Sequence, residues 1–216
     1  MITLWHCMNA RSFRPLWALE EMGLRYRLRL LPFPPRVEAP EFLERNPLGT
    51  IPLLEDGAAR MTESAACCQY LADRYGPTPL AVRPDEPEFA AYLNGLHYGE
   101  ATLTFPQTLV LRYARFEPAE RQIPQVAEDY ARWFFARLRA LTARLDDGRE
   151  WYCDRFTMAD ISVGYALMLA VQIGMEERFN PTIAAYLQRL RAREGWRRAD
   201  AAQHAAAAGP AADPSA

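Results

Sequence analysis

Short apolar runs alternate with helical spacing over the first 75 residues. The runs 2–5 (ITLW) and 26–31 (YRLRLL) predict two strands, the second from its strict alternation. Between them, Ser12 to Met22 has helical spacing. Pro15 stands in its first turn and Gly23 just past its end, which is the usual arrangement of these residues at helix ends.

A hairpin and two more helices are predicted before residue 76. The apolar run IPLL, from residue 51, and the segment 59–62 flank an Asp56-Gly57 turn, and this pattern predicts a β-hairpin. A short helix is expected near 40–45 and a longer one over 63–75. The predicted order is βαβα-ββα, so residues 1–76 are expected to form an α/β domain.

Beyond a proline-rich linker at 77–87 the pattern becomes helical throughout. Residues 126–145 carry apolar positions at spacings of three and four, which is typical of an amphipathic helix. Thr157 and Asp160 form a capping-box pattern before a helix that is apolar on every face, and such a helix is usually buried. We therefore expect an all-helical domain over 88–200, followed by a low-complexity tail over 201–216 that is disordered apart from some continuation of the last helix.

Charge and composition exclude several classes of function. The net charge is −2 and all 25 basic residues are arginine, without a basic stripe, so nucleic acid is not an expected partner. No apolar run reaches about 18 residues and no secretion leader is visible, so we expect a cytoplasmic protein without a membrane span. Four cysteines without a C-x-x-C pair and three histidines predict neither a disulfide framework nor a metal site.

Pro52 is unusual because it stands where a core strand begins. Proline cannot donate a ladder hydrogen bond, and a cis Ile51–Pro52 bond would leave the backbone of Ile51 open to an extended peptide. Downstream, Glu63 and Ser64 stand at a predicted helix start, where backbone N–H groups bind anions. Ser64 can donate to a carboxylate and Glu63 can accept from an ammonium group, so together they suit the α-amino-acid end of a short peptide.

The segments NPLGTIPLL, TES and FTMADIS, in this order and spacing, resemble the cytosolic glutathione transferases over residues 1 to about 196. The resemblance implies a thioredoxin-like N-terminal domain, an all-helical C-terminal domain, a homodimer and a role in detoxification. It also implies that glutathione is a co-substrate, that no other cofactor is needed, and that Pro52 is cis. Ile51 would bind the cysteinyl backbone of glutathione, and Glu63 with Ser64 would hold its γ-glutamyl end.

The resemblance places the group that activates the thiol of glutathione after the first strand, in HCMNARSFRPLW. This segment lacks tyrosine, so a bacterial, non-tyrosine type is expected. Ser12 is the preferred candidate, although a simple N-cap would look the same in sequence. Asn9 and Arg11 are alternatives, and Cys7 would instead form a mixed disulfide with glutathione, which would indicate a reductase.

Two binding groups remain to be assigned, one for the glycine end of glutathione and one for the second substrate. Arg36 is the candidate for the glycine carboxylate of glutathione. The second substrate, a small hydrophobic electrophile, is expected between the domains, beside His97, Tyr98, Thr104 and Tyr113, although His97 and Tyr98 can equally be core or dimer contacts. Disulfide or peroxide reduction and non-catalytic glutathione binding are the alternative functions.

Overall fold

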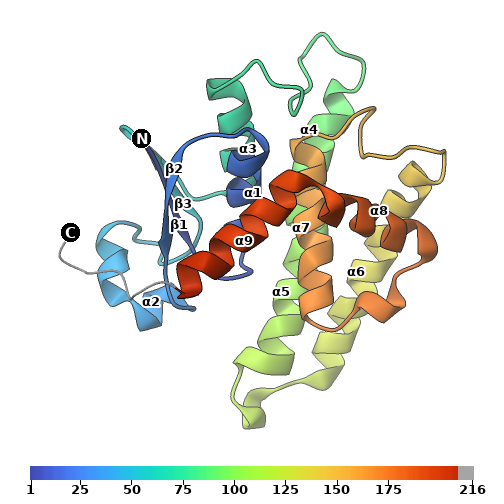
Figure 1. Ribbon diagram of the computed structural model, residues 1–216. Helices are drawn as coiled ribbons and strands as arrows, with labels where there is room; N and C mark the ends of the chain where they lie inside the picture. Colours follow the sequence, from blue (N-terminus) through green and yellow to red (C-terminus); the bar gives the residue numbers. More distant parts are fainter. Residues whose placement is uncertain (209–216) are drawn as a thin grey trace. The chain divides into compact units, whose positions relative to one another are not determined.

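A four-stranded sheet organises the N-terminal part of the chain (Figure 1). Its order is β2-β1-β3-β4, with β1 (Ile2–His6) parallel to β2 (Tyr26–Leu30) and antiparallel to β3 (Leu53–Asp56). The hairpin partner of β3 is β4 (Ala59–Met61). This thioredoxin-like sheet, followed by a helical region, confirms the predicted fold class.

The structure is a computed structural model that describes residues 1–208, and it divides the chain into two units. The first unit combines Met1–Arg74 with the described residues from Ala192 onward, and the second is Tyr75–Arg191. Besides the sheet, the first unit contains helices that lie in the sequence as follows: α1 (Phe13–Glu21), α2 (Pro35–Glu38), the 3-10 helix η1 (Pro40–Glu44), α3 (Ser64–Arg74) and α9 (Glu194–Ala208).

The C-terminal helix α9 differs from the expectation for this part of the chain. Only a short continuation of the last helix is expected beyond residue 200, and α9 instead extends to Ala208 and packs against α1 and β2 of the first unit. Alanine is the best helix former, so the alanine-rich composition that looks like low complexity also supports a helix. Trp196 packs against Phe13, with ring centroids 6.1 Å apart. The rest of the expected tail, 209–216, lies outside the described residues.

The second unit is helical. Its elements are α4 (Phe89–His97), η2 (Tyr98–Thr104), α5 (Phe105–Leu111), η3 (Arg112–Phe116), η4 (Ala119–Arg121), α6 (Pro124–Leu145), α7 (Met158–Gln172), η5 (Glu176–Arg178) and α8 (Pro181–Ala192). Helix α7 is buried from Met158 to Ala170, as its all-apolar pattern predicts. Its N-terminus has the capping box that the sequence indicates. The Thr157 hydroxyl accepts from the backbone N–H of Ala159 at 3.3 Å, and the Asp160 carboxylate accepts from the backbone N–H of Thr157 at 2.8 Å.

The proline-rich segment after α3 is part of the second unit, where the sequence suggested a linker. Leu80 and Val82 are buried, and the Leu80 carbonyl accepts a 2.8 Å hydrogen bond from the backbone N–H of Met158. Arg155 donates to the carbonyls of Pro79 and Ala81 at 2.9 and 2.7 Å. This proline-rich segment packs on the start of α7 and buries two of its apolar side chains there.

Candidate functional site

The loop after β1 lies beside the start of β3, because these strands run antiparallel. Trp5 near the end of β1 is paired with Leu53, the first residue of β3. The residues after His6 therefore face the residues before Leu53. Cys7 and Ile51 share one small apolar cluster, and Ala10 packs against it. The topology thus brings the predicted thiol-activating loop and the predicted peptide-binding edge together.

The backbone of Ile51 is open at this edge. The Ile51–Pro52 peptide bond is cis, and β3 begins only at Leu53. Within residues 1–208, no hydrogen bond engages the N–H or C=O of Ile51. The preceding loop is closed on itself, since Asn46 donates its side-chain amide to the Thr50 carbonyl at 2.7 Å. An extended peptide can therefore pair with Ile51 without displacing a ladder partner.

Arg36 is held close to this edge through Gly49. Gly49 has a φ of +58°, and a Cβ built on it would lie 2.6 Å from the Cβ of Arg36. Glycine is therefore required both by its backbone conformation and by the close approach of α2. The Arg36 side chain is exposed, and its backbone lies against the loop that leads to Ile51.

The start of α3 forms an anion-binding arrangement. Ser64 is 2% exposed, and its Oγ accepts a 3.1 Å hydrogen bond from Nη1 of Arg14, which is completely buried. The carbonyl of Glu63 accepts the first helical bond from Cys67 at 2.8 Å, so the N–H groups of the first turn begin directly after it. The helix N-terminus and the Arg14 charge both favour a carboxylate here, while the exposed Glu63 side chain can accept from an ammonium group. From the sequence, Arg14 is a candidate only as a second positive charge beside Arg11 that favours the thiolate, and its pairing with Ser64 was not predicted.

Ser12 does not present its hydroxyl to the surface. It is completely buried, its Oγ donates to Nδ1 of His6 at 2.7 Å, and it accepts from the backbone N–H of Cys7 at 3.2 Å. It makes no side-chain cap to α1 either. The structure therefore does not support Ser12 as the thiol-activating group, nor as a side-chain N-cap, because the hydroxyl is turned back to the end of β1.

Asn9 and Arg11 are the partly exposed candidates in this loop. Asn9 has a φ of 58°, in the left-handed region that asparagine tolerates better than most residues. Its backbone N–H donates to Oε1 of Gln203 at 3.1 Å, and its Oδ1 accepts from Nε2 of Gln203 at 3.0 Å. Sequence reasoning missed Gln203, because the segment that contains it was read as a disordered tail.

Cys7 is unsuited to nucleophilic chemistry in this structure. It is completely buried, and its thiol donates to the carbonyl of Pro32 at 3.4 Å. Burial raises the pKa of Cys7 to about 12, so the thiol is protonated at neutral pH.

The residues expected around a second substrate do not share one cavity within the second unit. Thr104 is buried and donates to the Gly99 carbonyl at 2.8 Å, and the Tyr98 hydroxyl donates to the Arg137 carbonyl at 2.7 Å. Burial raises the pKa of Tyr98 well above its usual range. His97 is exposed at the end of α4. Tyr98 and Thr104 are thus engaged in helix packing, which agrees with the core alternative for Tyr98, whereas His97 does not belong to the core.

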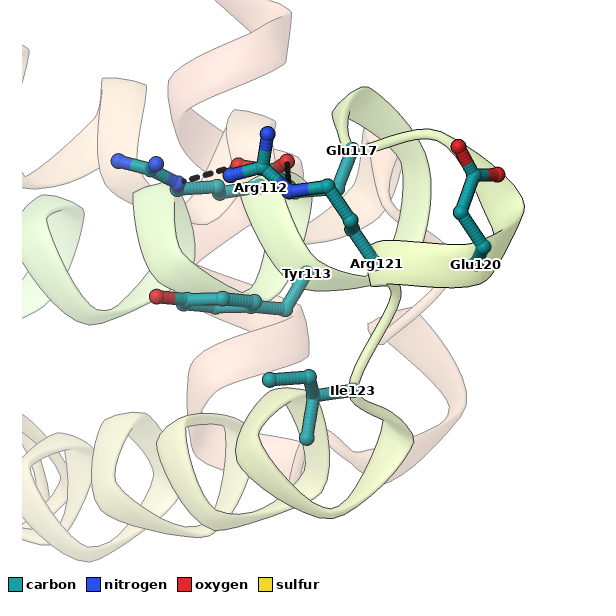
Figure 2. Close-up of a pocket in the computed structure, with 6 residues that line it drawn as sticks. All are labelled: Arg112, Tyr113, Glu117, Glu120, Arg121 and Ile123. Carbon is teal, nitrogen blue, oxygen red and sulfur yellow. Dashed lines mark hydrogen bonds and ion pairs between the residues drawn. The ribbon is translucent and has the colours of Figure 1, made fainter.

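Tyr113 instead lines a surface pocket formed by η3, η4 and the start of α6 (Figure 2). Arg112 and Arg121 in this pocket share Glu117 as their ion-pair partner, at 2.9 and 3.2 Å. The lining contains two arginines and two glutamates, so its formal charges sum to zero. The pocket shares only Tyr113 with the predicted site residues and contains none of the glutathione-site candidates.

Residues 1–208 contain no cluster of three or more histidine, cysteine or acidic side chains that could hold a metal ion. In the same residues, no helix combines the length and the hydropathy that a membrane crossing requires.

The first unit combines a thioredoxin-like sheet, an open peptide edge and an anion site, and a helical unit follows it in the sequence. Together these features define a class of glutathione-binding proteins. The family model "Glutathione S-transferase, N-terminal domain" matches residues 10–74. Glutathione S-transferase GstB of Escherichia coli is 29% identical over 210 residues, 92% of this chain and 97% of GstB. Glutathione S-transferase 3 of Schizosaccharomyces pombe is 33% identical over 103 residues, 48% of this chain and 43% of that protein.

Solved structures agree with these sequence matches. The glutathione transferase URE2P6 of Phanerochaete chrysosporium, solved in complex with oxidized glutathione, is 26% identical with a TM-score of 0.82, covering 95% of this chain and 97% of that chain. This protein therefore contains a glutathione S-transferase N-terminal domain at residues 10–74, and the chain as a whole resembles the glutathione transferases.

Proposed function

We propose that this protein binds glutathione and activates its thiol for attack on a small hydrophobic electrophile. The observation that carries the proposal is the open backbone of Ile51, which shares an apolar cluster with the loop after β1 and belongs to the same unit as the anion-binding start of α3. The transferase names of the curated relatives support the same function.

In the proposed complex, glutathione lies extended along the edge before β3. Its cysteinyl backbone pairs with the N–H and C=O of Ile51, as an added strand does. The γ-glutamyl carboxylate binds at the start of α3, where Ser64 can donate its hydroxyl proton while Arg14 donates to the Ser64 oxygen. Glu63 accepts from the γ-glutamyl ammonium group, and Arg36 pairs with the glycyl carboxylate.

Thiol activation is assigned to Asn9, with Arg11 adding positive charge. The pKa of a free thiol is about 8.5, and donors or cations near the sulfur favour the thiolate. The Asn9 amide lies in a partly exposed loop at the end of β1, whereas the Ser12 hydroxyl is enclosed. The thiolate forms a carbon–sulfur bond with the electrophile, the leaving group departs with the bonding electron pair, and the thiol proton passes to solvent.

Glutathione-dependent reduction of a disulfide or peroxide is the second candidate, since a similar structure contains oxidized glutathione. The buried, protonated Cys7 weighs against a mixed disulfide with the protein. Reduction would then use two glutathione thiols, which become one glutathione disulfide while the acceptor bond is cleaved.

The resemblance to the glutathione transferases also leads us to propose a homodimer, which light scattering would test.

The binding mode is tested by calorimetric titration with glutathione, followed by assays with an aryl halide and with a peroxide. Glu63→Gln removes the partner of the ammonium group, and we expect affinity to fall about tenfold, equivalent to about 1.4 kcal/mol. Asp73→Asn is the matched control, because it neutralises an exposed carboxylate near the other end of the same helix. Equal affinities for both variants would contradict the proposed position of the γ-glutamyl end. Binding without turnover of either substrate would favour a non-catalytic module.

A further inference from the structure

Gln203 is a buried polar residue that connects α9 to the loop after β1. Its side chain is completely buried, and both ends of its amide are used. Oε1 accepts from the backbone N–H of Asn9 at 3.1 Å and lies 3.2 Å from Nε2 of His6. Nε2 donates to Oδ1 of Asn9 at 3.0 Å and to Oδ1 of Asp200 at 2.9 Å. A primary amide has two donor hydrogens and two acceptor lone pairs, so its full capacity is used.

The two bonds to Asn9 act on different parts of that residue. One holds the backbone N–H and so supports the left-handed φ of 58°, and the other holds the side-chain oxygen. Because an amide group is planar, fixing Oδ1 of Asn9 also fixes the direction of its Nδ2 hydrogens. These hydrogens are the donors that the proposed thiol activation requires.

The contact to His6 extends the same network to Ser12. Burial lowers the pKa of His6 to about 4, so the ring is neutral near pH 7. Since Oε1 of Gln203 can only accept, the ring proton is on Nε2, and Nδ1 then accepts from the hydroxyl of Ser12. The hydroxyl oxygen in turn accepts from the backbone N–H of Cys7. Every donor in this chain of bonds meets an acceptor.

The arrangement distinguishes glutamine from glutamate at position 203. A glutamate would place a carboxylate oxygen where the Gln203 nitrogen now meets the oxygens of Asn9 and Asp200. Both contacts would change from hydrogen bonds to repulsion between acceptors. Position 203 therefore needs an amide, and a polar side chain without amide hydrogens would not satisfy these contacts.

We propose that α9 is a latch on the loop after β1, in which Gln203 is the positioning residue that holds Asn9 for thiol activation. The inference rests on the proposed function, because it assigns Asn9 the role described there. The latch belongs to the first unit alone, since α9, α1 and the sheet all lie within it (Figure 1). It gives the C-terminal helix a role in catalysis without any contact to substrate.

The latch is tested with Gln203→Met, which keeps the length of the side chain and removes the amide. The matched control is Arg197→Met, which places the same residue at an exposed position of α9. Steady-state rates with an aryl halide, and the ultraviolet absorbance of bound glutathione thiolate against pH, are measured for both. For Gln203→Met we expect kcat to fall about tenfold, KM for glutathione to change less than threefold, and the pKa of the bound thiol to rise toward about 8.5. Rates and thiol pKa like those of the wild type would overturn the proposal.

A second measurement applies even if Gln203→Met does not fold. Hydrogen exchange in the wild type, without any variant, reports on the backbone N–H of Asn9. The latch predicts slow exchange at this amide, and exchange as fast as in an unprotected loop would contradict it. If the wild type binds no glutathione, the proposed function fails, and hydrogen exchange still decides whether the latch exists.

Discussion

Replacement of Ser12 by alanine separates a structural role of this residue from a catalytic one. The substitution removes the donor to Nδ1 of His6 and the acceptor of the Cys7 N–H, whose bonds are 2.7 and 3.2 Å long. All three residues are completely buried, so water cannot readily take over either contact. Ser12→Ala therefore leaves one buried donor and one buried acceptor without partners.

The size of the effect follows from these two groups. A buried polar group without a partner costs about 1–3 kcal/mol, so for two such groups we expect the free energy of unfolding to fall by about 2–6 kcal/mol. This is a large part of the total stability of an ordinary domain, which is about 5–15 kcal/mol. The thiol-activating group is Asn9 in this account, so kcat with glutathione and an aryl halide should change less than about tenfold.

Urea unfolding gives the stability, and initial rates at a temperature where the variant is folded give kcat and KM. Ser12→Cys is a useful companion, since a thiol retains weak donor and acceptor capacity and should lose less stability. A fall in kcat of about a hundredfold or more, with unchanged unfolding free energy, would refute the reasoning and return thiol activation to Ser12.

Further predictions concern buried groups in both units. Cys7→Ala should retain conjugation activity within about threefold, and loss of all turnover in this variant would restore the mixed-disulfide alternative. Asp160→Ala removes the acceptor of four hydrogen bonds, from Tyr152, Tyr186 and twice from Thr157, and should lower the unfolding free energy by more than about 3 kcal/mol in urea titrations. Burial lowers the pKa of His6 from 6.5 to about 4, so its stabilising contribution, about 3 kcal/mol, is present above pH 6.5 and lost as pH falls toward 4. Burial raises the pKa of Asp160 from 3.8 to about 6, so this group makes stability rise as pH falls, in the opposite sense to His6. The contribution of His6 is therefore obtained by subtracting the unfolding free energy of His6→Gln from that of the wild type at each pH. Identical pH profiles of stability for the two proteins would contradict the burial argument.

Local patterns predicted much of the fold. The alternation in YRLRLL, the turn at Asp56-Gly57 and the capping box of Thr157 and Asp160 each depend on neighbours in sequence, and the structure contains all three features. The clustering of Ile51 with the loop after β1 was not predicted, and it arises because β3 lies antiparallel to β1 in the sheet.

The side-chain partners of the site could not be predicted in the same way. Ser12 at a helix start normally caps or faces solvent, and only the position of His6 at the end of a buried strand turns it inward. Arg14 finds Ser64 fifty residues away, and Asn9 finds Gln203 across 194 residues. Such contacts depend on tertiary packing, and the composition of the C-terminal segment concealed the last of them.

A crystal structure of the protein with bound glutathione tests the central claim most directly. We expect the cysteinyl N–H and C=O of glutathione to pair with the backbone of Ile51, and its sulfur to lie within about 3.5 Å of Nδ2 of Asn9. A tripeptide bound away from Ile51, or a sulfur that meets the hydroxyl of Ser12 in place of the Asn9 amide, would contradict it.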